Sequence, residues 1–233
     1  MAEKVTIGNC ELWHGDCREV LPLLPACDLI LTDPPYGIAH KWTGGFGHGW
    51  GKAKEKAELR NEWDAEAPDL GFLLSMPGEK IVWGGNHFAL PASRCWLVWR
   101  KEINPALTLG DAELAWTTLD KTVRVFDHPR NKLTGDKVPP HPTQKPVPLM
   151  EWCLSILPKA QTICDPYMGS GTTGVACARM GLQFVGIERE RKYFDIACRR
   201  IEQAYAQPRL FEDAKVGAGD TAVQGDMLLP ANK

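Results

Sequence analysis

The segment "LILTDPPYG", residues 29 to 37, ends a short apolar run with an aspartate, two prolines and a tyrosine. The run has the length of a buried strand, and the prolines prevent it from extending further. A second segment, "TICDPYMGSGTTG", residues 162 to 174, ends another apolar run in a similar way. In an open α/β sheet, residues at the carboxyl ends of parallel strands project into the ligand site. Asp33 and Asp165 are therefore site candidates in an α/β protein.

The rest of the chain supports this fold class, because short apolar runs alternate with helix-like segments as in βαβ units with a mainly parallel sheet. Strands are expected near Glu11–His14, Leu29–Thr32, Ile81–Trp83, Trp96–Trp99, Leu114–Trp116, Val123–Phe126, Thr162–Cys164 and Phe184–Ile187. Helices are expected over Cys17–Leu24, Asp69–Ser75, Pro148–Leu157, Thr172–Met180 and Lys192–Ala204. We predict one domain over residues 1–207 and a loosely held tail over 208–233, where periodicity is lost.

Composition is consistent with a single domain, because 233 residues with 44% hydrophobic content can form one continuous core. No signal-like start or long apolar run is present, which predicts a cytoplasmic protein without a membrane partner. The 8 cysteines show no CxxC spacing. Cys10, His14 and Cys17 are conceivable metal ligands, but scattered reduced thiols are the preferred interpretation. We expect no metal and no disulfide.

The net charge of -2 does not indicate a nucleic-acid binder, but the positive charges are clustered. The segment 40–60 mixes lysines with tryptophan, phenylalanine and glycine, which suits a loop that meets phosphates and bases. A solvated flexible loop is an equally good interpretation of that segment alone. A second basic stretch runs from 121 to 146. The candidate DNA-binding residues are Lys41, Lys52, Lys54, Lys56, Arg130 and Lys132.

The glycine loop "GSGTTG", from Gly169 to Gly174, follows an expected strand and opens an expected helix, and Glu188 lies at the end of the next strand. This layout is typical of a nucleotide site, with free backbone N–H groups at the helix start and an acidic group for ribose hydroxyls. Asp165 at the rim would repel a pyrophosphate but could accept from an ammonium group. S-adenosylmethionine is therefore favoured over a dinucleotide, with a plain tight turn as a third interpretation.

The segment after Asp33 is a candidate acceptor surface. Its two prolines are stiff and lack N–H donors. The Asp33 carboxylate and the Pro34 carbonyl could accept both N–H bonds of an exocyclic amine, while Tyr36 stacks on the ring that carries the amine. Such acceptors would stabilise positive charge that develops as the amine of adenine attacks a methyl group. A base inside a duplex would first have to flip out. A purely structural Pro-Pro turn is the alternative.

Four motifs, "TDPPYG", "DPYMGSGTTG", "HPTQKP" and "GIERE", resemble those of the exocyclic-amino DNA methyltransferases. Their order resembles the class in which the catalytic motif precedes the cofactor loop, and in particular the compact phage-type adenine-specific members. The resemblance implies a Rossmann-like S-adenosylmethionine-dependent methyltransferase fold, α/β, with a circularly permuted seven-stranded mainly parallel sheet and helices on both faces.

The resemblance also assigns roles to residues. It implies that Asp33, Pro34, Pro35 and Tyr36 form the catalytic segment. It places the following residues around the cofactor: Asp16, Cys17, His141, Thr143, Lys145, Asp165, Tyr167, Gly169, Ser170, Gly171, Thr172, Thr173 and Glu188. The interval from Asp127 to His141 is too short for a separate target-recognition domain, so loops 40–60 and 127–140 are the candidates for sequence recognition. We interpret "WLVWRK" and "ELAW" as core strands, and "WGGNHF" either as a glycine turn or as a source of base-edge groups.

The preferred hypothesis is a site-specific methyltransferase that acts on adenine N6, because aspartate rather than serine precedes Pro-Pro-Tyr. Cytosine N4 is the nearest alternative. A non-catalytic nucleic-acid-binding protein of the same fold and an NAD-dependent oxidoreductase are the alternatives from other classes. Double-stranded DNA is the expected partner. A homodimer and a companion restriction endonuclease are left open.

Overall fold

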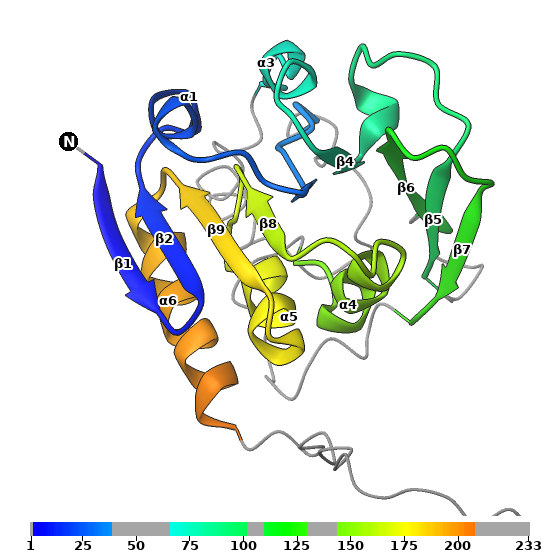
Figure 1. Cartoon of the computed structure of the whole chain (residues 1–233). Helices are drawn as coiled ribbons and strands as arrows, with labels where there is room; N and C mark the ends of the chain where they lie inside the picture. Colours follow the sequence, from blue (N-terminus) through cyan, green and yellow to red (C-terminus); the bar gives the residue numbers. More distant parts are fainter. Residues whose placement is uncertain (1, 39–65, 102–109, 130–143, 208–233) are drawn as a thin grey trace, which may run out of the picture.

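The structure is a computed structural model that describes residues 2–38, 66–101, 110–129 and 144–207 (Figure 1). Within these ranges the strands form one nine-stranded sheet in the order β1-β2-β9-β8-β3-β4-β6-β5-β7. In chain order the strands are β1 (Glu3–Ile7), β2 (Cys10–His14), β3 (Leu29–Thr32), β4 (Glu79–Trp83), β5 (Trp96–Arg100), β6 (Ala112–Thr117), β7 (Arg124–Asp127), β8 (Thr162–Asp165) and β9 (Gln183–Glu188). The expected tail, 208–233, lies outside the described residues.

The sheet is mainly parallel, as predicted. Strands β2, β9, β8, β3 and β4 pair in parallel, β6 runs antiparallel to β4 and β5, and β7 is parallel to β5. β1 adds to the edge through an antiparallel hairpin with β2. In that two-residue turn, Gly8 has a φ of 55°, a conformation that glycine adopts without strain.

The expected count of seven strands is wrong, because the described residues alone form a sheet of nine. All eight strands inferred from apolar runs are present, with ends that differ from the expected ones by at most two residues. The strand that sequence analysis missed is β1, "EKVTI", which has no fully buried residue and pairs on one side only. An edge strand of that kind carries a weak hydrophobic signal.

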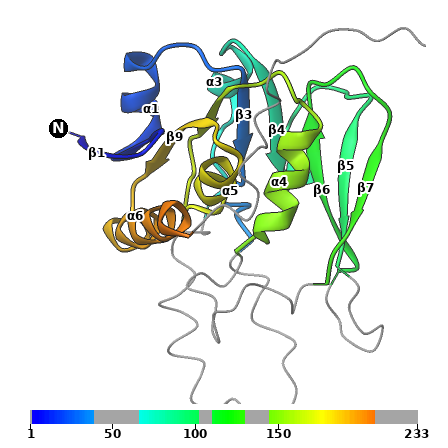
Figure 2. The same cartoon turned by 60° about the horizontal axis from the view of Figure 1, so that its bottom comes forward.

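Helices cover both faces of the sheet, which confirms the predicted layering (Figure 2). The α-helices are α1 (Cys17–Val20), α3 (Gly71–Leu74), α4 (Val147–Ser155), α5 (Thr172–Met180) and α6 (Arg191–Ala206), and the 3-10 turns are η1 (Leu21–Leu23) and η4 (Gly85–His87). Helices α4, α5 and α6 enclose one apolar cluster, whereas α1 and α3 belong to a second. The helix expected over Cys17–Leu24 is shorter and continues as η1, which contains Pro22.

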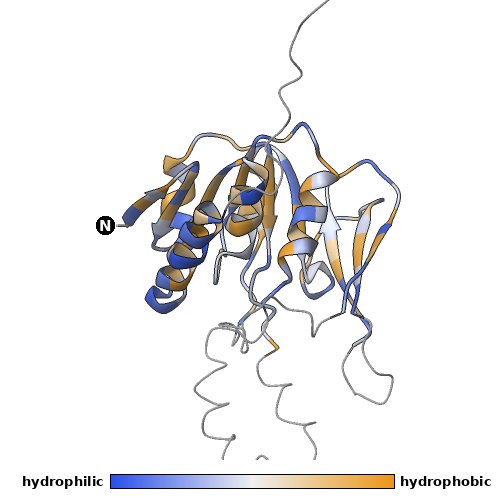
Figure 3. Ribbon diagram, turned by 90° about the horizontal axis from the view of Figure 1, so that it is seen from below, coloured by the Kyte–Doolittle hydropathy of each residue, from blue (hydrophilic) through white to orange (hydrophobic). Residues whose placement is uncertain are grey.

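The central strands are buried on both sides, so that alternate residues enter different clusters. In β3, Leu29 and Leu31 pack with α4 and α5, whereas Ile30 faces the other cluster. Figure 3 shows hydrophobic residues on the central strands, whereas α6 carries both hydrophobic and hydrophilic residues. Phe194, for example, is only 1% exposed on α6. In the described ranges, no helix has the length and apolar character needed to cross a bilayer.

Candidate functional site

The segments 29–37 and 162–174 lie next to each other at the edge of the sheet where the parallel strands have their carboxyl ends. Strands β3 and β8 pair in parallel, with Leu29 opposite Ile163 and Ile30 opposite Cys164. Thr32, the last residue of β3, donates a 2.7 Å hydrogen bond from its hydroxyl to Asp165 Oδ1. The expected catalytic segment and the expected cofactor loop are therefore joined by a buried hydrogen bond, although they are far apart in sequence.

The expected catalytic segment is held in a compact turn after β3. Tyr36 donates its hydroxyl proton to Asp33 Oδ1 at 2.5 Å. Pro34 is buried, and Gly37, with a φ of 69°, redirects the chain. Because the two prolines fix their own φ angles, the turn presents Asp33 and Tyr36 on a stiff backbone.

Tyr36 packs against the segment that follows β4. Its ring stacks on His87 with centroids 4.9 Å apart and planes 17° from parallel. Gly84, at a φ of 67°, lies so close that an added Cβ would be 2.0 Å from Tyr36 Cε1. "WGGNHF" therefore packs against Tyr36 and supports its ring. Its glycine turn was expected, but the contact with Tyr36 was not.

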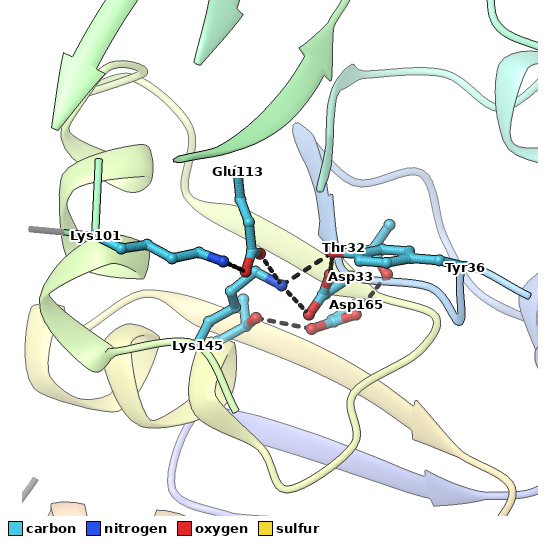
Figure 4. A network of polar contacts seen from close by, with 8 residues as sticks. Thr32, Asp33, Tyr36, Lys101, Glu113, Lys145 and Asp165 are labelled. Carbon is cyan, nitrogen blue, oxygen red and sulfur yellow. Dashed lines mark hydrogen bonds and ion pairs between the residues drawn. The ribbon is translucent and has the colours of Figure 1, made fainter. Parts of the chain in front are cut away.

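Lys145 brings a third segment into this site. Its ammonium lies 2.5 Å from Asp33 Oδ2 and 3.0 Å from the Tyr36 hydroxyl. It also lies 3.0 Å from Glu113 Oε2, and the other Glu113 oxygen is 2.6 Å from Lys101 Nζ. Figure 4 shows these charges as a continuous chain from Lys101 to Asp33. The resemblance places Lys145 beside the cofactor, and does not indicate its pairing with Asp33.

The electrostatics of the site follow from burial and from these pairs. Burial raises the pKa of Asp33 above its usual range, although the Lys145 ammonium opposes this shift. Burial also raises the pKa of Tyr36, and Asp33 adds to it, so the phenol stays protonated. Glu113 differs, because the attraction of Lys145 and Lys101 outweighs its burial and lowers its pKa to about 2. The attraction of the Asp33 and Glu113 carboxylates outweighs the burial of Lys145 and raises the pKa of Lys145 well above its usual range.

The glycine loop connects β8 to α5, as predicted. Gly169 and Gly171 have φ values of 53° and 79°. A Cβ at Gly169 would meet nothing nearer than 4.0 Å, whereas a Cβ at Gly171 would lie 2.8 Å from the Cβ of Ala197. The first glycine therefore faces open space, and the second permits close packing against α6.

Asp165 lies deep at the base of this loop and is only 3% exposed. In addition to the Thr32 bond, it accepts from the Thr173 hydroxyl at 2.7 Å and from the Tyr167 N–H at 3.2 Å. Burial raises its pKa to about 7, although these hydrogen bonds oppose the shift. A carboxylate with such a pKa changes its charge near neutral pH.

Glu188 closes the loop from β9. Its Oε2 accepts from Gly169 N at 2.8 Å, and its Oε1 accepts from Glu190 N at 2.7 Å. Burial raises its pKa. Glu188 is thus close enough to the loop to contact a ligand that lies on Gly169.

Asp16 and Cys17 lie near the same edge, because β2 pairs in parallel with β9 and places His14 opposite Glu188. Asp16 caps α1 by accepting from Arg18 N at 2.8 Å. Cys17 is buried in the apolar cluster against which the partly buried Tyr167 packs. These residues therefore form one wall beside the loop.

Two residues of the loop region were missed by sequence analysis. Arg200, on α6, lies 2.5 Å from the Ser170 carbonyl and 3.0 Å from the Ser170 hydroxyl, and both accept from its guanidinium. Ser170 also donates to Gln144 Oε1 at 3.1 Å. Gln144 belongs to the quoted motif "HPTQKP" and could have been found from it, whereas nothing local singles out Arg200 on an amphipathic helix.

Several expected site residues lie outside the described ranges. They are Lys41, Lys52, Lys54, Lys56, Arg130, Lys132, His141 and Thr143. Loop 40–60 and most of loop 127–140 lie there too. Among the residues that the structure does describe, no group of three or more His, Cys, Asp or Glu is arranged to hold a metal ion.

The fold and the edge site define an α/β protein with a glycine-rich loop beside an acidic, proline-rich turn. Residues 82–199, about half of the chain, match the N6_N4_Mtase family, described as DNA methylase. The chain belongs to this family.

Two relatives match a shorter segment of the chain. One is the Type II methyltransferase M2.DpnII of Streptococcus pneumoniae, 48% identical over 63 residues, which are 27% of this chain and 24% of that protein. The other is the Type II methyltransferase M2.LlaDCHI of Lactococcus lactis subsp. cremoris, 44% identical over 64 residues, with the same coverage of 27% and 24%. The chain thus spans about a quarter of the length of these relatives.

Among solved structures, the PvuII DNA methyltransferase (cytosine-N4-specific) superposes with a TM-score of 0.53. The match covers 91% of this chain and 89% of that chain at 15% identity. At this identity the likeness supports the fold alone, and it agrees with the predicted methyltransferase class of α/β fold.

Proposed function

We propose that the protein is an S-adenosylmethionine-dependent DNA methyltransferase that transfers a methyl group to the exocyclic N6 amine of a flipped-out adenine. The observation that carries the proposal is the pairing of β3 with β8. It brings the Asp33–Tyr36 turn and the glycine loop to one edge, where the Thr32–Asp165 hydrogen bond joins them. Membership of a DNA methylase family supports the same chemistry.

The loop residues fit the proposed cofactor. Open space above Gly169 lets a ligand approach the backbone. Gln144 Nε2 is buried and has no hydrogen-bond partner among the described residues, so an amide donor is available for a carboxylate beside Ser170. Asp165 is the acceptor proposed for the ammonium group, and Glu188 the acceptor for the ribose hydroxyls. A cation beside Asp165 would offset the burial that raises its pKa.

The other cofactor assignments come from the resemblance. Asp16 and Cys17 are proposed to lie near the cofactor adenine. Tyr167, Thr172 and Thr173 belong to the segment Asp165–Thr173, which is proposed to hold the methionine moiety, and the two threonines lie in the first turn of α5. His141 and Thr143 lie outside the described residues. The bound cofactor supplies an electrophilic methyl group on a sulfonium sulfur.

Asp33 is the group proposed to prepare the amine for attack. Its carboxylate and the Pro34 carbonyl would accept the two N–H bonds of the amine and stabilise the positive charge that develops on nitrogen. Asp33 already accepts from Tyr36 and Lys145, but the two carboxylate oxygens have about four lone-pair sites and so retain capacity for the amine. No covalent intermediate with the protein is required.

Tyr36 is the proposed stacking group for the flipped base. His87 stacks on the Tyr36 ring and holds it in place. Stacking of a base on an aromatic ring contributes about 1–3 kcal/mol, which offsets part of the few kcal/mol required for flipping.

Adenine is preferred over cytosine because of the resemblance to adenine-specific members, in which aspartate precedes Pro-Pro-Tyr. Cytosine N4 is the competing substrate, because its amine needs the same two acceptors. Double-stranded DNA is the partner that the proposal requires, with the basic loops as its contacts and the cytoplasm as its compartment. A homodimer and a companion restriction endonuclease stay secondary hypotheses.

The proposal is tested by transfer of tritiated methyl groups from S-adenosylmethionine to mixed-sequence duplex DNA, followed by digestion and identification of the labelled nucleoside. N6-methyladenine is the expected product. N4-methylcytosine would retain the mechanism but change the substrate base. DNA binding without any transfer would favour the non-catalytic alternative and overturn the proposal.

A further inference from the structure

Four charged side chains of alternating sign run through the site from Lys101 to Asp33 (Figure 4). Lys101 follows β5, Glu113 lies on β6, Lys145 precedes α4, and Asp33 follows β3. The lysine side chains are only 10% and 5% exposed, whereas those of Glu113 and Asp33 are 27% and 26% exposed. In each pair the ammonium is therefore the more buried partner, and the carboxylates of Glu113 and Asp33 are both partly exposed.

An ammonium as buried as Lys145 is costly unless it is paired and hydrogen-bonded. Lys145 is compensated on two sides, by Asp33 at 2.5 Å and by Glu113 at 3.0 Å. Glu113 is in turn shared with Lys101 at 2.6 Å. Two positive and two negative charges make the set neutral, so its members stabilise one another as a unit.

The Lys145 ammonium is directed at groups of the protein. Its Nζ donates hydrogen bonds to Asp33 Oδ2 and to the Tyr36 hydroxyl, and Glu113 Oε2 lies 3.0 Å away as an ion-pair partner. Its raised pKa means that it keeps its proton near neutral pH. Lys145 therefore acts on the protein rather than directly on the reacting amine.

The need for such a group follows from the environment of Asp33. A carboxylate that accepts from an amine must be ionised, whereas burial favours its protonated form. The groups that face it are Lys145, Tyr36 and Glu113, and Asp165 lies near enough to interact electrostatically. Tyr36 donates a hydrogen bond, but among these groups Lys145 alone contributes a positive charge.

We propose that Lys145 is a positioning residue for methyl transfer, which keeps the Asp33 carboxylate ionised and oriented, and that Glu113, supported by Lys101, holds the Lys145 ammonium in place. This inference rests on the proposed methyltransferase function. It gives Glu113 and Lys101, which sequence analysis assigned to plain core strands, a role in the site.

The test is the pH dependence of single-turnover methyl transfer at saturating cofactor and DNA, so that changes in cofactor affinity do not enter. In Lys145→Met, the Asp33 carboxylate loses the attraction of the Lys145 ammonium but is still repelled by the Glu113 carboxylate. The acid limb of the profile should move to a pH about 1–3 units higher than in wild type. Below this limb the rate of methyl transfer should fall about tenfold per pH unit, and at high pH it should recover.

The double variant Glu113→Gln/Lys145→Met provides the decisive comparison. Removal of Glu113 takes away its repulsion of Asp33, so the acid limb should lie between those of wild type and Lys145→Met. The double variant loses one charge of each sign, so it also serves if the single variant fails to fold. In that case an acid limb above the wild-type position supports the proposal, and one at the wild-type position overturns it.

Glu11→Gln is the matched control. Glu11 lies on β2 and pairs at 3.5 Å with Lys4 at the exposed edge of the sheet, so its profile should equal that of wild type. A uniform loss at every pH in Lys145→Met, with no shift, would show a merely structural role and overturn the inference. An inactive wild-type protein would instead contradict the proposed function.

Discussion

Lowering the pH below about 7 should weaken the binding of S-adenosylmethionine, because Asp165 becomes protonated. Burial raises the pKa of this carboxyl to about 7, and the positive ammonium group of the cofactor would favour the ionised form. At about pH 6 roughly one tenth of the free protein has an ionised Asp165, and at about pH 8 roughly nine tenths. Affinity should therefore rise about tenfold over this interval, with proton release on binding at the lower pH.

The assay is isothermal titration of the cofactor at several pH values, in buffers of different ionisation enthalpy so that released protons are counted. Asp165→Asn should bind more weakly, and most of the pH dependence should be lost. Glu188 also has a raised pKa, so Glu188→Gln is the matched comparison and should retain the dependence that Asp165 causes. Equal pH dependence in wild type and Asp165→Asn would refute the assignment of Asp165 to the cofactor ammonium.

The same pKa shift predicts how the stability of the free protein depends on pH. The folded-state pKa of about 7 lies above the usual value of 3.8, so the folded protein binds the proton more tightly. Asp165 therefore contributes stability that is fully present below about pH 4 and is lost as the pH rises through about 7, by up to about 4 kcal/mol. Thermal unfolding should show a flatter pH dependence in Asp165→Asn.

Three further predictions concern other parts of the site. Gly84→Ala should slow methyl transfer at least about tenfold, because its Cβ would lie 2.0 Å from Tyr36 Cε1, whereas Gly110→Ala, whose Cβ would be 3.8 Å from the nearest atom, should not change the rate. Glu188→Ala should weaken cofactor binding by about 1.5–3 kcal/mol in titration, and an unchanged affinity would exclude Glu188 from the site. Neutralising Lys52, Lys54 and Lys56 together should make the slope of log K for DNA binding against log salt concentration shallower by up to about three. An identical slope would contradict phosphate contacts by these lysines.

Much of the fold could be predicted because the central strands are buried on both faces. The apolar run at Leu29–Thr32 and the helix at Thr172–Met180 match the structure at both ends. The glycine loop and Glu188 could be inferred from spacing alone, and the structure brings them together through the Gly169–Glu188 hydrogen bond. The edge strand β1 was missed because its residues are half polar and pair on one side only.

The charged chain around Asp33 could not be predicted from local sequence. Lys145 and Asp33 are separated by 112 positions, and their contact depends on how β3 and the start of α4 meet at the sheet edge. Glu113 lies in a strand whose buried neighbours, Ala115 and Trp116, indicate only a core position. A single charged residue in such a strand gives no signal of its partners, because those come from other elements.

The acceptor role of Asp33 is tested most directly by single-turnover methyl transfer in Asp33→Ala, with cofactor binding measured by titration on the same preparation. The groups proposed to bind the cofactor come mainly from β8, β9 and the glycine loop, so the dissociation constant for S-adenosylmethionine should stay within about threefold of wild type. DNA binding should persist, because phosphate contacts dominate affinity. Methyl transfer should fall to background. Transfer at the wild-type rate by Asp33→Ala would contradict the mechanism.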